Sequence, residues 1–512
     1  MRRSFVVAAV TAALGLSGLL PAAASEAPEP AAPSSGEQAL ATVKDLLGPT
    51  TTLARRSEQG AHPGRPEVSL AMRDLFAALP QLDPAARRTA QGYLARPTDG
   101  SADPLGDGYT VSARKKCRGH LCIHWVPSTA DAPPSEAWVG TTLRFMNKTW
   151  RTEVRKLGYR KPIGDKHRGG NGKFDVYLKE LGSRGIYGYC TPERRAPGHK
   201  WLASGYCVLD NDFAEAQFGA PPKHSLRVTA AHEFFHAVQF AYDYAEDPWL
   251  MESTATWMEE RVADDVNDNR QYLPYGQVGA PGRPLDLFNR QGFNQYGNWT
   301  FFEYLSSRFG AGIVKQVWTR AGAFKGAGHQ YSTTAVKGAL KHHGGFVSAY
   351  RGFAAANTVP GRVYPEGKSW PTAPVAATWK LSKVAPRQHA RMAIDHLSSR
   401  NVLVKPDGAM KDKRWKLRVV VDGPARKTSP TAYVVTRTKH GVDRKTVRLN
   451  RQGTGHTMVG FSTTRVRWAK VVLVNASTRY SCWHRTTWSC QGRPRDNNEK
   501  FKVVVAAVRE KH

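Results

Sequence analysis

The stretch AAHEFFHAVQF at residues 230–240 decides the fold of the chain around it. It contains no Gly or Pro and is apolar around its polar residues, which predicts a buried helix. His232 and His236 are four residues apart, so on a helix their side chains project from the same face. Neutral imidazoles are good ligands for Zn²⁺, and the adjacent carboxylate of Glu233 is placed to take a proton from a water molecule. The stretch therefore predicts two zinc ligands and a general base on one helical turn.

A catalytic zinc site needs a third protein ligand. The best candidate is Glu252, in the run WLMESTATWMEE at residues 249–260. An acidic residue that opens a second helix, packed antiparallel against the first, can turn its carboxylate towards the two histidines. Glu259, two turns further along, stays open as an alternative ligand. Asp243 either orients a ligand histidine or is a plain turn residue. The metzincin pattern is not expected, because Tyr242 stands where its third histidine would be.

These two runs, together with FDVYL at residues 174–178, resemble the gluzincins, which are thermolysin-like and aminopeptidase-N-like zinc peptidases. They resemble a group of secreted bacterial metalloproteases more closely, over roughly residues 117–310. The resemblance implies the zinc ligands His232, His236 and Glu252, with Glu233 as the catalytic residue.

The sequence departs from the gluzincin pattern in two ways. Fifteen residues separate His236 from Glu252, fewer than in the better-known members, so we expect a shorter connecting segment. Ser253 stands where aminopeptidases have a glycine, and no amine-binding glycine motif is evident. We therefore favour an endopeptidase over an aminopeptidase.

Hydrolysis also needs a donor for the developing oxyanion. Tyr296 starts a predicted helix, and a tyrosine downstream of the ligand helix has this role in related peptidases. An ordinary packing aromatic is the other interpretation, and both stay open. Asp165, the run GGNG at residues 169–172 and Asp175 faintly resemble a calcium loop. Their spacing fails the EF-hand pattern, so we do not expect calcium.

The N-terminus predicts export. Arg2 and Arg3 precede an apolar run, and PAAAS at residues 21–25 resembles a signal-peptidase site, which gives a signal peptide over residues 1–25. No later stretch reaches the length of a membrane span. The cysteines fall into local pairs, 117/122, 190/207 and 482/490, for which disulfides are expected in an oxidising compartment. We therefore expect a secreted, extracellular protein.

The chain then divides into three regions. Residues 26–106 show helical periodicity and form either a pro-segment or a permanent helical subdomain. Residues 107–356 mix strands with the ligand helices, which predicts an α+β, zincin-like catalytic domain. Residues 375–512 switch to a period of two, with strand runs at 415–421 and 470–474, which predicts a β-sandwich accessory domain.

The charge is unevenly spread. The whole chain carries +32, and residues 371–512 contain 30 Lys and Arg against 8 Asp and Glu. Such a surface attracts polyanions such as cell-wall polymers, or it is simply the solvated surface of a basic exported protein. Two functions are therefore predicted: a secreted zinc endopeptidase acting on proteins or peptides, and, as the alternative, a cell-wall or polyanion-binding protein whose zincin fold is incidental.

Overall fold

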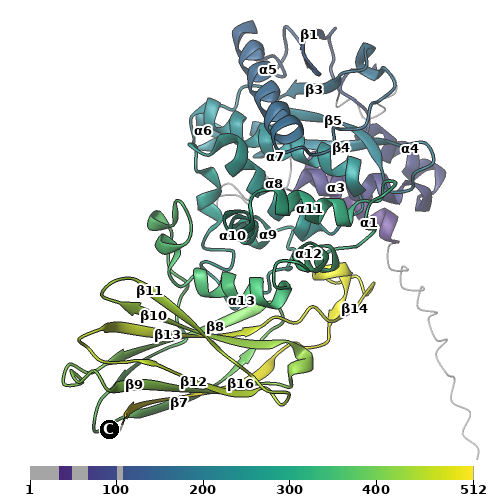
Figure 1. Ribbon diagram of the computed structural model, residues 1–512. Helices are drawn as coiled ribbons and strands as arrows, with labels where there is room; N and C mark the ends of the chain where they lie inside the picture. Colours follow the sequence, from purple (N-terminus) through teal and green to yellow (C-terminus); the bar gives the residue numbers. More distant parts are fainter. Residues whose placement is uncertain (1–33, 49–66, 101–107, 511–512) are drawn as a thin grey trace, which may run out of the picture.

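The computed structural model describes residues 34–48, 67–100 and 108–510. The predicted signal peptide at residues 1–25 lies outside these described residues. The chain is 37% helical and 25% strand, which confirms the mixed α+β character expected from the sequence. Figure 1 shows the arrangement: a sheet with helices against it in the upper part and two further sheets in the lower part.

The described part of the N-terminal region is helical. Its elements are α1 (Ser35–Leu47), α3 (Val68–Ala78), the 3₁₀ turn Leu79–Gln81 and α4 (Pro84–Tyr93). A capping box between Ser34 and Glu37 starts α1. Leu70, Met72 and Leu75 of α3 are fully buried, and a helix that is buried nearly all round belongs to an interior. The helical character expected for residues 26–106 is confirmed for these described elements, with Pro80 in the 3₁₀ turn between α3 and α4.

The first sheet has the strand order β1-β2-β3-β5-β4. Its strands are β1 (Arg114–Arg118), β2 (Leu121–Trp125), β3 (Phe174–Lys179), β4 (Gly188–Arg195) and β5 (Ala203–Asp210). The three inner strands are parallel, and β1 and β4 are antiparallel edges. The sequence did not predict β4, because it carries Pro192 and a register shift between Pro192 and Arg194. Proline is tolerated at such an edge, where no ladder hydrogen bond is lost.

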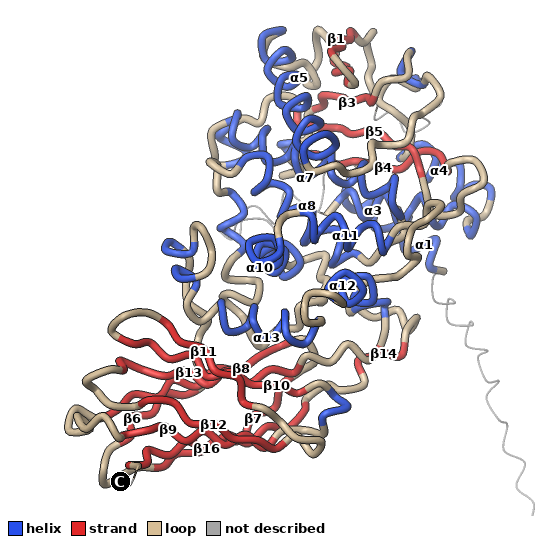
Figure 2. The backbone as a smooth tube through the Cα atoms, viewed as in Figure 1, coloured by secondary structure: helices blue, strands red, loops and turns tan. Residues whose placement is uncertain are grey.

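Helices pack against this sheet and continue below it (Figures 1 and 2). They are α5 (Glu136–Trp150), α6 (Glu215–Phe218), α7 (Pro222–Asp243), α8 (Pro248–Ala263), α9 (Asn294–Gly297), α10 (Trp299–Phe309), α11 (Gly312–Ala321), α12 (Thr333–Leu340) and α13 (Phe346–Ala356). Helix α7 contacts α5, α8, β4 and β5, so it lies at the centre of this part of the molecule. The mixture of strands and helices expected for residues 107–356 is confirmed, and α5 continues into a π-helical segment at Arg151–Lys156.

The C-terminal region consists of two sheets around a core of their own. Their strand orders are β11-β10-β13-β8-β6 and β12-β9-β16-β7. The strands are β6 (Ala377–Leu381), β7 (Arg387–Ile394), β8 (Ser398–Pro406), β9 (Trp415–Asp422), β10 (Pro430–Thr438), β11 (Val442–Val447), β12 (Thr454–Gly460), β13 (Val466–Asn475) and β16 (Glu499–Arg509), with a small β14 (Tyr480–Ser481) and β15 (Arg493–Pro494) ribbon. Val402, Val419, Val471 and Val503 are fully buried between the sheets. The alternation of buried and half-buried residues along β16 is the period of two that the sequence shows.

A buried carboxylate joins the C-terminal region to the helical part. Asp286, from the loop before α9, accepts hydrogen bonds from the Tyr480 hydroxyl at 2.7 Å and the Ser489 N–H at 2.8 Å. His396 Nε2 lies 3.0 Å from the other Asp286 oxygen. The Cys490 N–H donates to Asp247 at 2.7 Å. Asp247 is the N-cap residue of α8, so the C-terminal region contacts the start of the helix that carries Glu252.

All six cysteines form disulfides, in the sequential pairing expected: Cys117–Cys122, Cys190–Cys207 and Cys482–Cys490. The first closes the β1–β2 hairpin and the second joins the edge strand β4 to β5. Disulfides are typical of oxidising compartments. Among the described residues, no helix combines the length and the apolar character that crossing a membrane requires.

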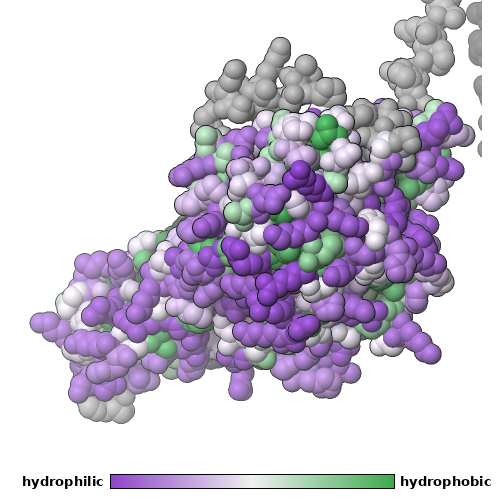
Figure 3. Space-filling model, turned by 90° about the horizontal axis from the view of Figure 1, so that it is seen from above, coloured by the Kyte–Doolittle hydropathy of each residue, from purple (hydrophilic) through white to green (hydrophobic). Residues whose placement is uncertain are grey.

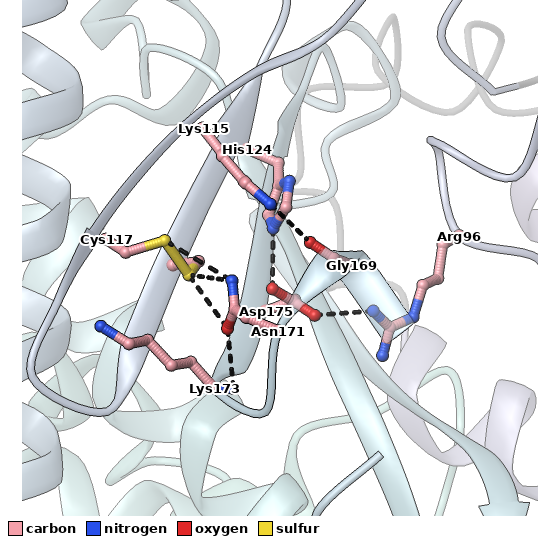
Figure 4. The surroundings of a disulfide bond; sticks show 9 residues. Arg96, Lys115, Cys117, His124, Gly169, Asn171, Lys173 and Asp175 are labelled. Carbon is pink, nitrogen blue, oxygen red and sulfur yellow. Dashed lines mark hydrogen bonds and ion pairs between the residues drawn. A yellow bond between two sulfur atoms is a disulfide. The ribbon is translucent and has the colours of Figure 1, made fainter. Parts of the chain in front are cut away.

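The N-terminal region is anchored by one buried guanidinium (Figure 4). Arg96 is 1% exposed and binds Asp165 at 2.8 Å, Asp175 at 2.6 Å and Glu193 at 2.7 Å. The other Asp175 oxygen lies 2.7 Å from His124 Nε2. The acidic residues that faintly resembled a calcium loop therefore surround an arginine.

Replacing Arg96 by Ala should lower the free energy of unfolding by about 3–5 kcal/mol, because it leaves buried carboxylates without their cation. Arg168→Ala is the matched control, since Arg168 binds Asp99 and Glu193 from a partly exposed position and such pairs contribute about 1 kcal/mol or less. Urea denaturation of both variants measures the difference. Equal losses would show that Arg96 is not the anchor.

Candidate metal centre and catalytic site

Helix α7 presents His232 and His236 on one face. It starts with Pro222 at its first turn, where a missing N–H costs nothing, and every residue from Val228 to Asp243 is buried. The two imidazole rings lie 5.0 Å apart, centroid to centroid. The sequence prediction of two histidines on one buried helical face is thus confirmed, and both imidazole rings lie in the protein interior.

Helix α8 brings Glu252 to the two histidines. Helix α7 ends at Asp243 and α8 begins at Pro248, so the connection is short, as the spacing required. The carboxylate oxygens of Glu252 lie 3.2 Å from His232 Nε2 and 3.3 Å from His236 Nε2. One ligand atom from each of the three residues lies within 4.8 Å of the others. The structure therefore brings together the three residues proposed as ligands.

The geometry of this group suits a tetrahedral ion. Zinc bonds of about 2.0–2.1 Å in a tetrahedral site place neighbouring ligand atoms roughly 3.3 Å apart. One Glu252 oxygen lies 3.2 Å from His232 Nε2, and the other lies 3.3 Å from His236 Nε2. Within the described part of the chain, His236 Nε2 and Glu252 Oε1 are buried without a hydrogen-bond partner. Buried polar atoms rarely remain unsatisfied. The three residues therefore fit a divalent cation bound between them.

The second nitrogen of each ring is also engaged. His232 Nδ1 lies 2.8 Å from Glu259 Oε1, and His236 Nδ1 lies 2.8 Å from Gln239 Oε1. Carboxylate and carbonyl partners of this kind fix the ring orientation of metal-binding histidines. Glu259, the alternative ligand, is thus placed as a partner of His232. Asp243 accepts a hydrogen bond from the Ala245 N–H, which is the contact of a turn residue.

The electrostatics leave one imidazole neutral. Burial and, after it, the charge of the neighbouring His232 lower the pKa of His236 to about 3. Burial also raises the pKa of Glu252 well above its usual range, as does the nearby Glu67 carboxylate. A metal ligand must be deprotonated. His236 is already in the form that binds a cation, and a cation would favour ionised Glu252.

The proposed base and the proposed oxyanion donor line the same small cavity. It has a volume of about 20 Å³, enough for roughly one water molecule. His232, Glu233 and Tyr296 line it, with Gly188 at the start of the edge strand β4. Tyr296 is 3% exposed, and burial raises the pKa of its phenol well above the ordinary value. The phenol therefore stays protonated and can donate a hydrogen bond.

Sequence reasoning missed two residues of this cavity, Glu67 and Ser69, which come from the N-terminal region. The Tyr296 hydroxyl donates to Glu67 Oε2, and the Ser69 hydroxyl donates to Glu233 Oε2 at 2.7 Å. Their only sequence signal is a Glu before a predicted helix, which is typical of any helix start. Nothing local in the sequence indicates contact with a site more than 160 residues further along the chain.

No protein-family model matches the chain, and no curated protein matches its sequence.

Replacing Glu259 by Gln should weaken zinc binding by about 10–100-fold, because His232 loses the carboxylate that orients its ring. Glu252→Ala should weaken it more, since a ligand itself is lost. Glu260→Gln is the control, because Glu260 lies next to Glu259 but accepts from Asn269. Competition titration with a zinc-binding dye measures the affinities. If Glu252→Ala binds zinc like the parent, the third ligand lies elsewhere.

Proposed function

We propose that this protein is a secreted zinc-dependent endopeptidase. The observation that carries the proposal is the convergence of His232, His236 and Glu252 at tetrahedral separations, beside Glu233. Two imidazoles and one carboxylate would leave a position open for water on a bound zinc ion, which is the donor set of a catalytic site. The resemblance of the two motif runs to gluzincins and the packing of helices against a mixed sheet support the same conclusion.

Zn²⁺ bound there would polarise a scissile carbonyl and lower the pKa of a water molecule. Glu233 takes the proton from the attacking water and delivers it to the leaving amine. The Tyr296 phenol donates a hydrogen bond to the oxyanion that develops on the carbonyl. Glu259 and Gln239 hold the two imidazole rings in position throughout.

The edge strand β4 offers a place for an extended peptide. Its first residue, Gly188, lines the cavity, and an edge strand presents unpaired backbone groups. Peptides commonly bind by adding a strand to such an edge. A chain bound along β4 passes the metal group, which suits cleavage within a peptide.

Replacing Glu233 by Gln should leave zinc binding unchanged and lower peptide hydrolysis by at least about 10²–10⁴-fold, because the proton acceptor is lost. The assay follows cleavage of a mixed peptide library by mass spectrometry, in the full chain and in a Glu67→Ala background that frees the cavity. Glu215→Gln, an exposed carboxyl at the start of α6, is the control. A chelator should stop cleavage and added zinc should restore it. Turnover of the Glu233→Gln variant at the parent rate would refute the assignment.

The alternative function, polyanion binding, is supported by a second cavity. It has a volume of about 520 Å³ and lies between the loops after α13 and the sheet containing β13. Its described charged lining residues are all basic: Arg362, Lys368, Lys405, Arg437 and Lys470. Trp370 and Trp468 line it as well. Figure 3 shows that hydrophilic residues predominate on the face it displays. We infer that the C-terminal region is a β-sandwich accessory domain that holds the enzyme on an anionic cell-wall polymer.

A Lys368→Ala/Lys405→Ala double variant should bind a phosphodiester polymer more weakly and with less dependence on salt. Each lost phosphate contact reduces the slope of log K against log salt by about 0.7–0.9. Lys383→Ala/Lys500→Ala changes the net charge equally at exposed positions outside the cavity and serves as the control. Elution from a polyanion column over a salt gradient compares them. Identical elution of the two double variants would mean that only the overall charge matters.

A further inference from the structure

We propose that the N-terminal region holds the full-length protein in a latent form, with Glu67 acting as an additional carboxylate ligand at the metal centre. This inference rests on the proposed function and goes beyond it, because it adds a ligand and a regulatory state to the same site. The region was expected to be either a pro-segment or a permanent subdomain. The contacts made by Glu67 and Ser69 favour an inhibitory pro-segment.

The carboxylate of Glu67 lines the same small cavity as His232, Glu233 and Tyr296. One of its oxygens accepts from the Tyr296 hydroxyl, and the other accepts from the Leu70 N–H at 3.0 Å. Its charge acts on the Glu252 carboxyl group, so the two buried acids are near neighbours. Two buried carboxyl groups that are near neighbours repel each other unless a proton or a cation lies between them. A divalent cation held by His232, His236 and Glu252 would satisfy both acids.

Helix capping alone does not account for Glu67. Glu67 is the N-cap residue of α3, but caps are preferentially Ser, Thr, Asp or Asn. Glu67 is 5% exposed, and burying a carboxylate costs several kcal/mol unless charged partners compensate for it. The longer acidic side chain reaches into the cavity and accepts a hydrogen bond from the Tyr296 hydroxyl there.

The Ser69 hydroxyl contacts both the proposed base, Glu233, and the edge strand β4. It donates to Glu233 Oε2 at 2.7 Å and accepts from the Cys190 N–H of β4 at 2.8 Å. A substrate needs the Glu233 carboxylate free to receive a proton, and an extended peptide needs the β4 backbone. The segment Glu67–Ser69 therefore fills the positions that the substrate, the water molecule and the oxyanion would use. Substrate and this segment exclude each other.

The rest of α3 is fixed in this position by apolar burial and by polar contacts. Leu70, Met72 and Leu75 are fully buried in the same core as the residues of α7 and α8. Arg73, which is 5% exposed, donates to the Glu246 carbonyl between α7 and α8 at 2.6 Å. Asp74 pairs with Arg290. These buried contacts fix the position of α3, which keeps Glu67 and Ser69 in the cavity.

The test compares full-length protein with its Glu67→Ala and Glu67→Gln variants, using a mixed peptide library and added zinc or cobalt. Glu67→Gln keeps an oxygen that can cap α3, so it is informative even if Glu67→Ala folds poorly. If fewer than about one molecule in ten has a free site, opening it raises hydrolysis at least about tenfold. Loss of a ligand should also weaken zinc binding by about tenfold or more and change the visible spectrum of the cobalt form. Glu37→Ala, in the exposed capping box of α1, should change none of these.

The outcomes separate this proposal from the proposed function. Weaker zinc binding and an altered cobalt spectrum in both Glu67 variants, without any peptide cleavage, would support the Glu67 ligand and refute the peptidase. Parent-level hydrolysis, zinc affinity and cobalt spectrum in both variants would overturn the latent form while leaving the peptidase in place. Slower hydrolysis in the variants would also overturn it, because Glu67 would then assist catalysis.

Discussion

The burial of ionisable groups between α7 and α8 is the constraint on which the rest of the structure depends. Glu252 and Glu259 approach His232 from two sides, at 3.2 and 2.8 Å, and all three side chains are buried. Carboxylates in such a place are stable only with charged or hydrogen-bonding partners held in good geometry. The short connection between the helices, the sheet above them and the apolar core around them supply that rigidity.

Buried charged groups with fixed partners also join the three regions of the chain. Arg96 connects the N-terminal region to three carboxylates of the sheet domain, and Asp286 connects the helical part to the C-terminal sheets. Each junction is a buried charge whose partners come from elsewhere in the sequence. Such contacts add orientation as well as energy, because a charged group loses its stabilisation when its partners move. The hydrogen bond from the Cys490 N–H to Asp247 likewise fixes the start of α8.

The N-terminal region is part of the site rather than an appendage. Its helix α3 shares one apolar core with α7 and α8. Glu67 and the first residues of α3 complete the wall of the cavity that His232 and Glu233 line. A region that closes a cavity from outside the main domain can be a control element, since the cavity opens when the region moves. The arrangement of the candidate metal ligands therefore depends on the same packing that positions this wall.

The sequence by itself determined the elements and the chemistry that depend on neighbouring residues. A spacing of four places His232 and His236 on one helical face, and the apolar periodicities give α7, α8, α10 and the long C-terminal strands. Only the tertiary structure decided that Glu259 and Gln239 orient the imidazoles, that β4 forms the edge, and that Glu67 and Ser69 reach the cavity. The Ser69–Glu233 contact joins residues 164 positions apart. Helical and strand periodicity extends over a few residues, whereas such a contact exists only after the core has brought distant segments together.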